Sequence, residues 1–278
     1  MICGTSTGGL IALLLVKKKF SIQEAITAYQ TLGPEIFKDE KGFITALARG
    51  ERFDSSIVAK VVTRMVGEEL MESEDQDSNC RVNSLCPFFF VFCFFTYLNH
   101  GNMKCFVTVR NRHIAPGAGA IYLIRSYRAN DTFVLPNGYS WPVAEAARAT
   151  SAAATYFLPL EIKWEGQSFY FEDAGMFNVN NPSYKAWEEI KKIPEFEGRE
   201  IGCFLSLGTG LPPTLAKGSA NHKPGKVSIW ARIFTQRWER IKKLLDELSK
   251  QATQTQEVHQ QMVATFKEHK LCVFWFVQ

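Results

Sequence analysis

A serine between glycines near the start of the chain is the first candidate for chemistry. Residues 4–9 read Gly-Thr-Ser-Thr-Gly-Gly, and Gly-x-Ser-x-Gly is typical of a nucleophile at a sharp strand-to-helix turn. Side chains two positions either side of Ser6 would collide there, which accounts for Gly4 and Gly8. The helix that follows would point its first amides at Ser6, with Thr7 as the first donor to an oxyanion. A glycine-rich turn with a solvated serine is the simpler alternative.

A carboxylate that could serve as the base comes much later in the chain. Residues 169–175 read Phe-Tyr-Phe-Glu-Asp-Ala-Gly, so Asp173 stands where a strand would end in a turn of small residues. A hydrolytic serine needs a base, and α/β sheets place their sites at the ends of strands. The plainer interpretation is that Asp173 only caps the turn.

Helices and strands that alternate along the chain would position these residues. Ser21 and Glu24 form a capping-box pattern, and Asp54 or Ser55 would cap a later helix. Residues 201–207 form a nearly continuous apolar run, as in a strand buried on both faces. We expect helices over residues 8–19, 22–32, 55–66, 143–154 and 182–193, and strands over 105–109, 121–125, 168–172 and 201–207. The alternation predicts an α/β fold with a largely parallel sheet.

Four motifs, taken together and in order, resemble the patatin-like phospholipases. They are residues 4–12, residues 146–153 (Ala-Ala-Arg-Ala-Thr-Ser-Ala-Ala), Asp173-Ala174-Gly175 with Asn180-Asn181-Pro182, and residues 206–210 (Ser-Leu-Gly-Thr-Gly). The resemblance covers about residues 1–210. It implies a three-layer α/β/α hydrolase of acyl lipids such as phospholipids, with a Ser6–Asp173 dyad, an acyl-enzyme, and no metal or organic cofactor.

The chain departs from that family in two places. The family has Asp-Gly-Gly or Asp-Gly-Ala where this chain has Asp173-Ala174-Gly175, and an αL conformation at Ala174 would be strained. The family also has a Gly-rich oxyanion loop upstream of the serine, which this sequence does not show. We therefore expect a sheet that is incomplete at the N-terminus and a truncated chain that is inactive or nearly so, because losing an oxyanion donor typically costs about 10²- to 10³-fold in kcat.

The sequence suggests a patatin-like domain over residues 1–215 and a helical portion over 216–278 that packs on it. Residues 85–98 carry no charge and are rich in Phe. We predict that about residues 82–103 are a non-native insert, a translated intron. A buried strand and an interfacial membrane segment are the alternatives. The apolar residues 271–278 would form a final strand or be a second error of the gene model.

Composition limits the function classes. The 278 residues carry a net charge of +4 and 46% hydrophobic residues, which excludes a disordered, collagen-like or coiled-coil chain and gives little support to nucleic-acid binding. Seven Cys without a Cys-x-x-Cys pair and five His without an i, i+4 pair argue against a disulfide framework and a zinc site. The cysteine usage favours a cytoplasmic protein, and a lipid substrate would add peripheral membrane contact.

Other readings stay open at the level of sequence. His222 or His259 could complete a Ser-His-Asp triad of the α/β-hydrolase kind. A non-catalytic lipid-binding or interaction module with the same fold is the second rival, favoured by the absent oxyanion loop. Arg148, inside the second motif, is expected on a helix surface, with contact to an anionic headgroup as the alternative.

Overall fold

Strands and helices alternate along the chain, of which the computed structural model describes residues 1–38, 51–72, 103–113, 121–128, 139–154, 156–208, 255, 257–269 and 273–276. The strands are β1 (Ile2–Thr5), β2 (Cys105–Asn111), β3 (Ile121–Arg125), β4 (Leu160–Trp164), β5 (Gln167–Asp173), β6 (Phe204–Leu207) and β7 (Val273–Phe276). The helices are α1 (Thr7–Val16), α2 (Ile22–Ile36), α4 (Ser55–Val66), α5 (Val143–Thr150), α6 (Ser183–Ile190), a helix over residues 257–268, and the 3₁₀ helices η2 (Ala174–Phe177) and η3 (Pro194–Phe196).

Five strands form one mixed sheet around β2. β1 pairs parallel with residues 105–108 of β2, and β5 pairs antiparallel with residues 109–111. β3 pairs antiparallel with residues 106–110 and must occupy the opposite edge. β1 and β5 therefore approach each other end to end along one edge of β2. This register is the feature of the fold that decides where the candidate site forms.

The α/β class is confirmed, although the described sheet is mixed, where the sequence predicted a largely parallel one. β4, which the sequence analysis missed, pairs antiparallel with β5. Glu165 and Gly166 connect the two strands, both with positive φ (48° and 77°). A two-residue connection permits only antiparallel pairing, and this turn lacks the Asn-Gly signature that would have announced it.

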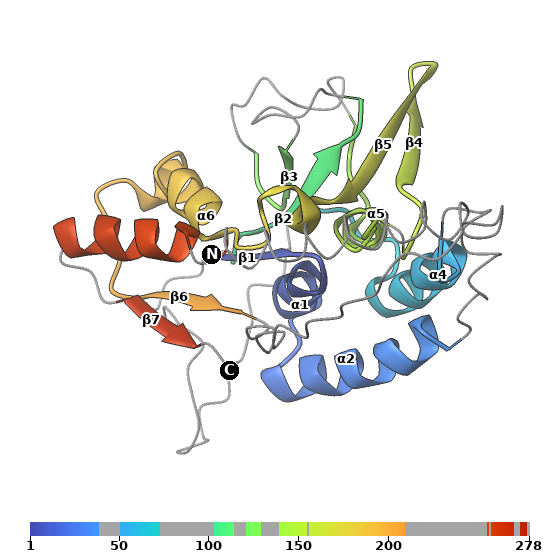
Figure 1. Cartoon of the computed structure of the whole chain (residues 1–278), viewed down its shortest axis with the longest axis horizontal. Helices are drawn as coiled ribbons and strands as arrows, with labels where there is room; N and C mark the ends of the chain where they lie inside the picture. Colours follow the sequence, from blue (N-terminus) through green and yellow to red (C-terminus); the bar gives the residue numbers. More distant parts are fainter. Residues whose placement is uncertain are drawn as a thin grey trace, which may run out of the picture.

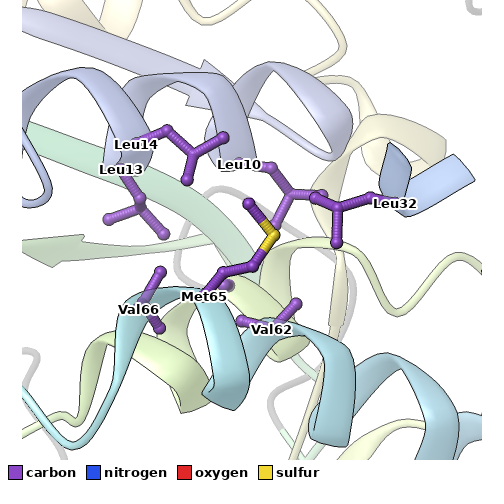
Figure 2. A pocket seen from close by; sticks show the side chains of 8 residues that line it. Leu10, Leu13, Leu14, Leu32, Val62, Met65 and Val66 are labelled. Carbon is purple, nitrogen blue, oxygen red and sulfur yellow. The ribbon is translucent and has the colours of Figure 1, made fainter. Parts of the chain in front are cut away.

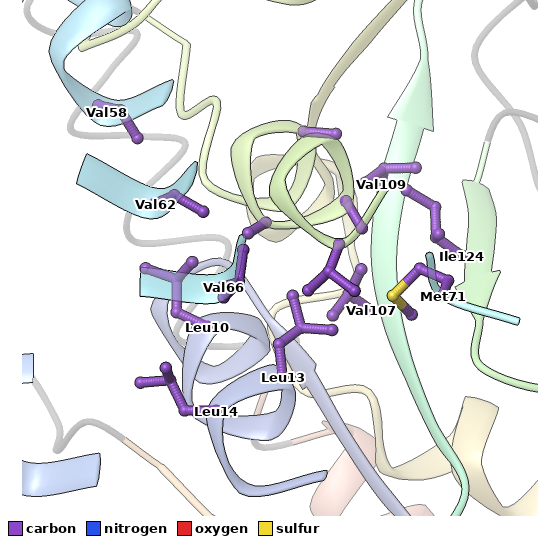
Figure 3. Packing of buried hydrophobic residues seen from close by; sticks show 14 of the residues in the cluster. Leu10, Leu13, Leu14, Val58, Val62, Val66, Met71, Val107, Val109 and Ile124 are labelled. Carbon is purple, nitrogen blue, oxygen red and sulfur yellow. The ribbon is translucent and has the colours of Figure 1, made fainter. Parts of the chain in front are cut away.

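Helices cover both faces of the sheet, which gives the three layers expected (Figure 1). Side chains alternate along β2, so Val107 and Val109 pack toward α1, α4 and α5 (Figure 3). Phe106 points the other way, against Leu123 of β3 and Ala186 of α6. The helix over residues 257–268 extends this second layer, where Met262 and Phe266 pack on Trp187.

α1 is buried almost all round because it lies between the sheet and α2. Seven of its ten residues are buried, and the helix has no polar face. A helix that is apolar on every side belongs inside a protein, and Figure 1 shows α1 between the strands and the other helices. The first turn of this helix, which carries the candidate nucleophile at its N-cap, is thus held by packing from several directions.

Local capping signals place several helix starts correctly. Ser21 and Glu24 form the predicted capping box at the start of α2, and the Asp54 carboxylate accepts from the Ser56 amide at the start of α4. Pro142 precedes the first residue of α5. Helix ends were predicted less well: α1 ends at Val16 and α5 at Thr150, because tertiary contacts rather than propensity end them.

A narrow apolar cleft remains between α1, α2, α4 and α5 (Figure 2). Its lining has no polar surface, and it consists of Leu10, Leu13, Leu14, Leu32, Val62, Met65, Val66 and Ala147. A cleft without a polar group cannot orient an ester carbonyl. This cleft is therefore a gap in helix packing and not part of the candidate site.

The C-terminal elements correct two expectations. The apolar run predicted as a fully buried strand gives β6, which pairs parallel with β7 in a separate two-stranded sheet and leaves Leu207 52% exposed. Cys203 is disulfide-bonded, whereas Cys3 and Cys105 carry free thiols, so the chain holds a disulfide although its cysteine pattern argued against a disulfide framework. Except for Met103, the predicted insert lies outside the described residues. Residues 216–254 of the predicted helical portion also lie outside them.

Within the described ranges, no helix combines the length and the apolar composition that crossing a bilayer requires.

Candidate active site

Ser6 occupies a strained position between β1 and α1. Its φ of 56° and ψ of −128° lie in a region that L-residues rarely adopt, and such strain persists only where the surroundings enforce it. Gly4 contributes to the surroundings that hold this conformation, because a Cβ atom at position 4 would stand 2.1 Å from the carbonyl oxygen of Gly8. The strand and the helix thus cross backbone against backbone, as the glycine pattern predicted for position 4.

The prediction for Gly8 is wrong, and Gly9 holds the steric role instead. A Cβ atom at Gly8 would have no heavy atom within 4 Å, whereas one at Gly9 would stand 2.8 Å from Cγ2 of Thr150 and 3.1 Å from Cγ1 of Val107. The reason is that Gly9 faces α5 and the sheet, while Gly8 faces open space. The close approach in this turn therefore depends on positions 4 and 9.

The register of β2 brings Asp173 next to Ser6. Thr108 of β2 pairs with Thr5, the last residue of β1, and Val109 pairs with Asp173, the last residue of β5. Since Thr108 and Val109 are consecutive, the carboxyl ends of β1 and β5 meet at one point. The Ser6 hydroxyl therefore lies near enough to the Asp173 carboxylate to act on its pKa as a hydrogen-bond partner.

The Asp173 carboxylate lies in an environment that raises its pKa. Only 4% of the residue is exposed, and burial is the main reason that its pKa rises from 3.8 to about 6. The hydrogen bonds from the Ser6 hydroxyl and the Gly175 amide (2.7 Å to Oδ1) oppose that rise, and the neighbouring Glu172 adds to it. A carboxylate with a pKa near 6 is a stronger base than one in water.

Ala174 is accommodated without strain. It begins the 3₁₀ helix η2 (Ala174–Phe177) and does not have a positive φ, so this position does not require the second glycine that the related motif carries. Gly175 is more restricted, because a Cβ atom there would stand 3.0 Å from Oδ1 of Asp173. A side chain at position 175 would press on the carboxylate that the Gly175 amide now holds.

The N-terminus of α1 offers donors beside the serine. The Gly9 amide bonds the Ser6 carbonyl at 2.9 Å, whereas Thr7 and Gly8 are the first two residues of the helix, whose amides have no acceptor within it. Such amides and the positive end of the helix dipole suit a developing negative charge. The arrangement can therefore stabilise an oxyanion formed at Ser6.

Sequence reasoning missed a second set of residues around this pair. The Ser6 amide donates to Oγ1 of Thr150 (3.0 Å), and the Asp173 amide donates to the carbonyl of Ala152 (3.1 Å). Both acceptors lie in residues 146–153, to which the sequence analysis assigned no role beyond the second motif of the family resemblance. On the other side, Arg110 pairs with Glu172 and stacks on Phe177, with its Cζ atom 3.9 Å from the ring centre.

Arg148 is not on a helix surface as predicted. It is 4% exposed, and its Nη2 atom donates to the carbonyl of Leu158. Burial lowers its pKa to about 10, and the charge of Glu51 opposes that change. α5 is covered on this side by the segment that follows it, so Arg148 joins that segment to the helix. Of the proposed triad histidines, His222 lies outside the described residues, and His259 lies in the second helical layer.

These features first define the class of protein: an α/β protein with a strained serine at a strand-to-helix turn and a buried carboxylate beside it. The chain belongs to the patatin-like phospholipase family, because the family model "Patatin-like phospholipase" matches residues 1–184. The match includes both Ser6 and Asp173.

Individual relatives carry names that agree with the family. The chain is 31% identical over 244 residues to the cGAMP-activated phospholipase of Vibrio cholerae, which covers 83% of this chain and 58% of that protein. It is 27% identical over 260 residues to the calcium-independent phospholipase A2-gamma of Rattus norvegicus, with 93% of this chain and 28% of that protein covered. This chain thus spans little more than a quarter of the rat relative and somewhat over half of the bacterial one.

Proposed function

We propose that this protein hydrolyses acyl esters of phospholipids through an acyl-enzyme on Ser6, with Asp173 as the base. The observation that carries the proposal is the register of β2, which brings the strained Ser6 beside the buried Asp173, where the serine hydroxyl acts on the pKa of the carboxyl. Family membership and the names of the relatives support the substrate class. Because phospholipids reside in bilayers, the proposal includes peripheral contact with a membrane surface.

The reaction would proceed in two halves. Ser6 Oγ attacks the ester carbonyl carbon while its proton passes to Asp173, and the amides of Thr7 and Gly8 stabilise the oxyanion. The intermediate collapses, and the alcohol leaves with the proton from Asp173. A water molecule then attacks the acyl-enzyme and gives its proton to Asp173. This second intermediate collapses, the bond to Ser6 Oγ breaks, Oγ takes the proton back from Asp173, and the fatty acid is released. No step requires a metal, and Asp173 shuttles the proton in both halves.

The raised pKa of Asp173 suits this role. A base works best when its pKa approaches the working pH while it remains ionised, and at pH 7 a group with a pKa of about 6 is mostly ionised. The hydroxyl and amide donors hold the carboxylate in one orientation toward Ser6. Below pH 6 the carboxylate is increasingly protonated, and activity should fall about tenfold per pH unit.

Fatty-acid release from phospholipid in detergent micelles tests the proposal, with three variants compared with the unaltered protein. The sequence led us to expect a chain that is inactive or nearly so, but the amides of Thr7 and Gly8 offer oxyanion donors at Ser6, and we therefore expect the unaltered protein to release fatty acid. Ser6→Ala and Asp173→Asn should each lower kcat by at least about 10³-fold. His259→Ala should leave kcat unchanged, since His259 lies in the second helical layer. Full activity in Asp173→Asn, or its loss in His259→Ala, would refute the dyad. Phospholipid binding without any hydrolysis by the unaltered protein would favour the non-catalytic module.

A further inference from the structure

The parallel ladder between β1 and β2 stops one hydrogen bond short at Ser6. The Ile2 amide donates to the Lys104 carbonyl (2.9 Å), and Ile2 to Thr5 pair in register with residues 105–108. Ladder donors on a parallel strand recur every second residue. The same register would therefore place the Ser6 amide on the Thr108 carbonyl. At Ser6, however, the backbone turns away with a φ of 56°.

The Thr150 hydroxyl occupies the gap that this turn leaves. Its Oγ1 accepts from the Ser6 amide at 3.0 Å and donates to the Thr108 carbonyl at 2.9 Å. Thr150 is fully buried, so water does not compete for these groups. The hydroxyl thus joins the same two backbone groups that an uninterrupted ladder would have joined directly.

The segment that carries the Thr150 hydroxyl also forms a hydrogen bond with the backbone of Asp173. Two residues after Thr150, the Ala152 carbonyl accepts from the Asp173 amide at 3.1 Å. The γ-methyl of Thr150 packs so closely on Gly9 that a Cβ atom there would stand 2.8 Å away. One short segment at the end of α5 therefore touches the backbone of Ser6, the backbone of Asp173 and the first turn of α1.

We propose that Thr150 is a positioning residue, whose hydroxyl replaces the missing ladder bond and thereby holds Ser6 in the strained conformation that faces Asp173. The inference rests on the proposed function for its effect on catalysis. Its structural part, the dependence of the positive φ at Ser6 on the Thr150 hydroxyl, stands apart from activity. The strain at a residue such as Ser6 is about as large as the penalty for an unpaired buried amide.

Thr150→Val and Thr150→Ser test this role together. Valine has the shape of threonine but leaves the Ser6 amide and the Thr108 carbonyl without the bridging hydroxyl, whereas serine keeps the hydroxyl and loses only the methyl. We expect Thr150→Val to lower both kcat and the rate of Ser6 labelling by a fluorophosphonate by about 10- to 100-fold with KM little changed. Thr150→Ser should stay within about threefold of the unaltered protein.

Ser183→Ala is the matched control for the loss of a buried hydroxyl. Ser183 is buried on α6, and its hydroxyl bonds that of Ser206 at 3.0 Å, away from Ser6. We expect its labelling rate to equal that of the unaltered protein. If Thr150→Val does not fold, Thr150→Ala removes the same hydroxyl without adding a methyl in its place.

The NMR Cα and Hα shifts of Ser6 report whether its φ stays positive, and they need no activity. We expect the positive-φ shifts in the unaltered protein and in Thr150→Ser, and their loss in Thr150→Val. Positive-φ shifts and an unchanged labelling rate in Thr150→Val would overturn the inference. If the unaltered protein is not labelled at Ser6, the proposed function fails, and the Ser6 shifts alone then decide the role of Thr150.

Discussion

At the residue scale, the candidate site depends on two glycines and one buried carboxylate. The sequence predicted Ser6, Gly4 and Asp173 because their chemistry and spacing are local or belong to recurring motifs. It misassigned the close approach at Gly8, since which glycine faces α5 depends on how α1 is rotated against the sheet. It also missed Thr150, because a single threonine in an Ala-rich helix carries no local signal for a hydrogen bond to a residue 144 positions away.

Gly4→Ala and Gly8→Ala should differ sharply in their effect on folding. The Cβ atom at position 4 meets the Gly8 carbonyl at 2.1 Å, whereas the one at position 8 meets no atom within 4 Å. We expect Gly4→Ala to lower the free energy of unfolding by more than about 3 kcal/mol and Gly8→Ala by less than about 1 kcal/mol. Urea denaturation followed by circular dichroism measures both. Similar midpoints for the two variants would mean that the turn is not packed as described.

Asp173→Asn should stabilise the protein at neutral pH while it removes activity. The folded-state pKa of about 6 exceeds the ordinary 3.8, so the folded protein holds this proton more tightly than the unfolded chain. Stability from this group is therefore present below about pH 4 and is lost as the pH rises toward 6. We expect Asp173→Asn to be more stable by about 1–3 kcal/mol at pH 7.5. The gain should disappear near pH 4, and a gain that persists there would contradict the assignment.

At the scale of elements, capping signals predict helix starts, and tertiary contacts set the rest. Ser21, Asp54 and Pro142 stand where the structure begins α2, α4 and α5. β4 escaped prediction because its turn residues are Glu165 and Gly166, which give no strong hairpin signal. The sequence also contained no indication of how α6 is anchored to the sheet, since the residues that bind α6 lie on β3 and just after β3.

α6 is held to the sheet by a buried ion pair whose removal can be measured. Glu189 is 1% exposed and accepts from the Arg125 guanidinium (2.5 and 3.0 Å) and from the Tyr127 hydroxyl (2.8 Å). Glu189→Ala leaves Arg125 without this partner, and we expect a loss of about 3–5 kcal/mol in the free energy of unfolding. The control is Lys185→Ala on the same helix, whose pair with Glu188 is partly exposed and should contribute less than about 1 kcal/mol. Equal losses would contradict this anchoring role.

At the scale of the whole molecule, the site exists because two strands of opposite direction end at consecutive residues of β2. The alternation of elements predicted the α/β class, and the family resemblance implied the three layers. Pairing direction and register depend on contacts more than 60 residues apart in the sequence, such as Val109 with Asp173, and no local pattern encodes them. Parallel β1 and antiparallel β5 therefore bring Ser6 and Asp173 together in a way that only the assembled sheet reveals.

The rate at which a fluorophosphonate labels Ser6, measured from pH 4 to pH 9, tests the central claim most directly. If Asp173 takes the proton from Ser6, the rate should rise about tenfold per pH unit up to about pH 6, the raised pKa of Asp173, and then level off. Asp173→Asn should abolish the rise and lower the plateau by at least about 10²-fold. An unchanged profile in Asp173→Asn, or labelling at a serine other than Ser6, would contradict the account.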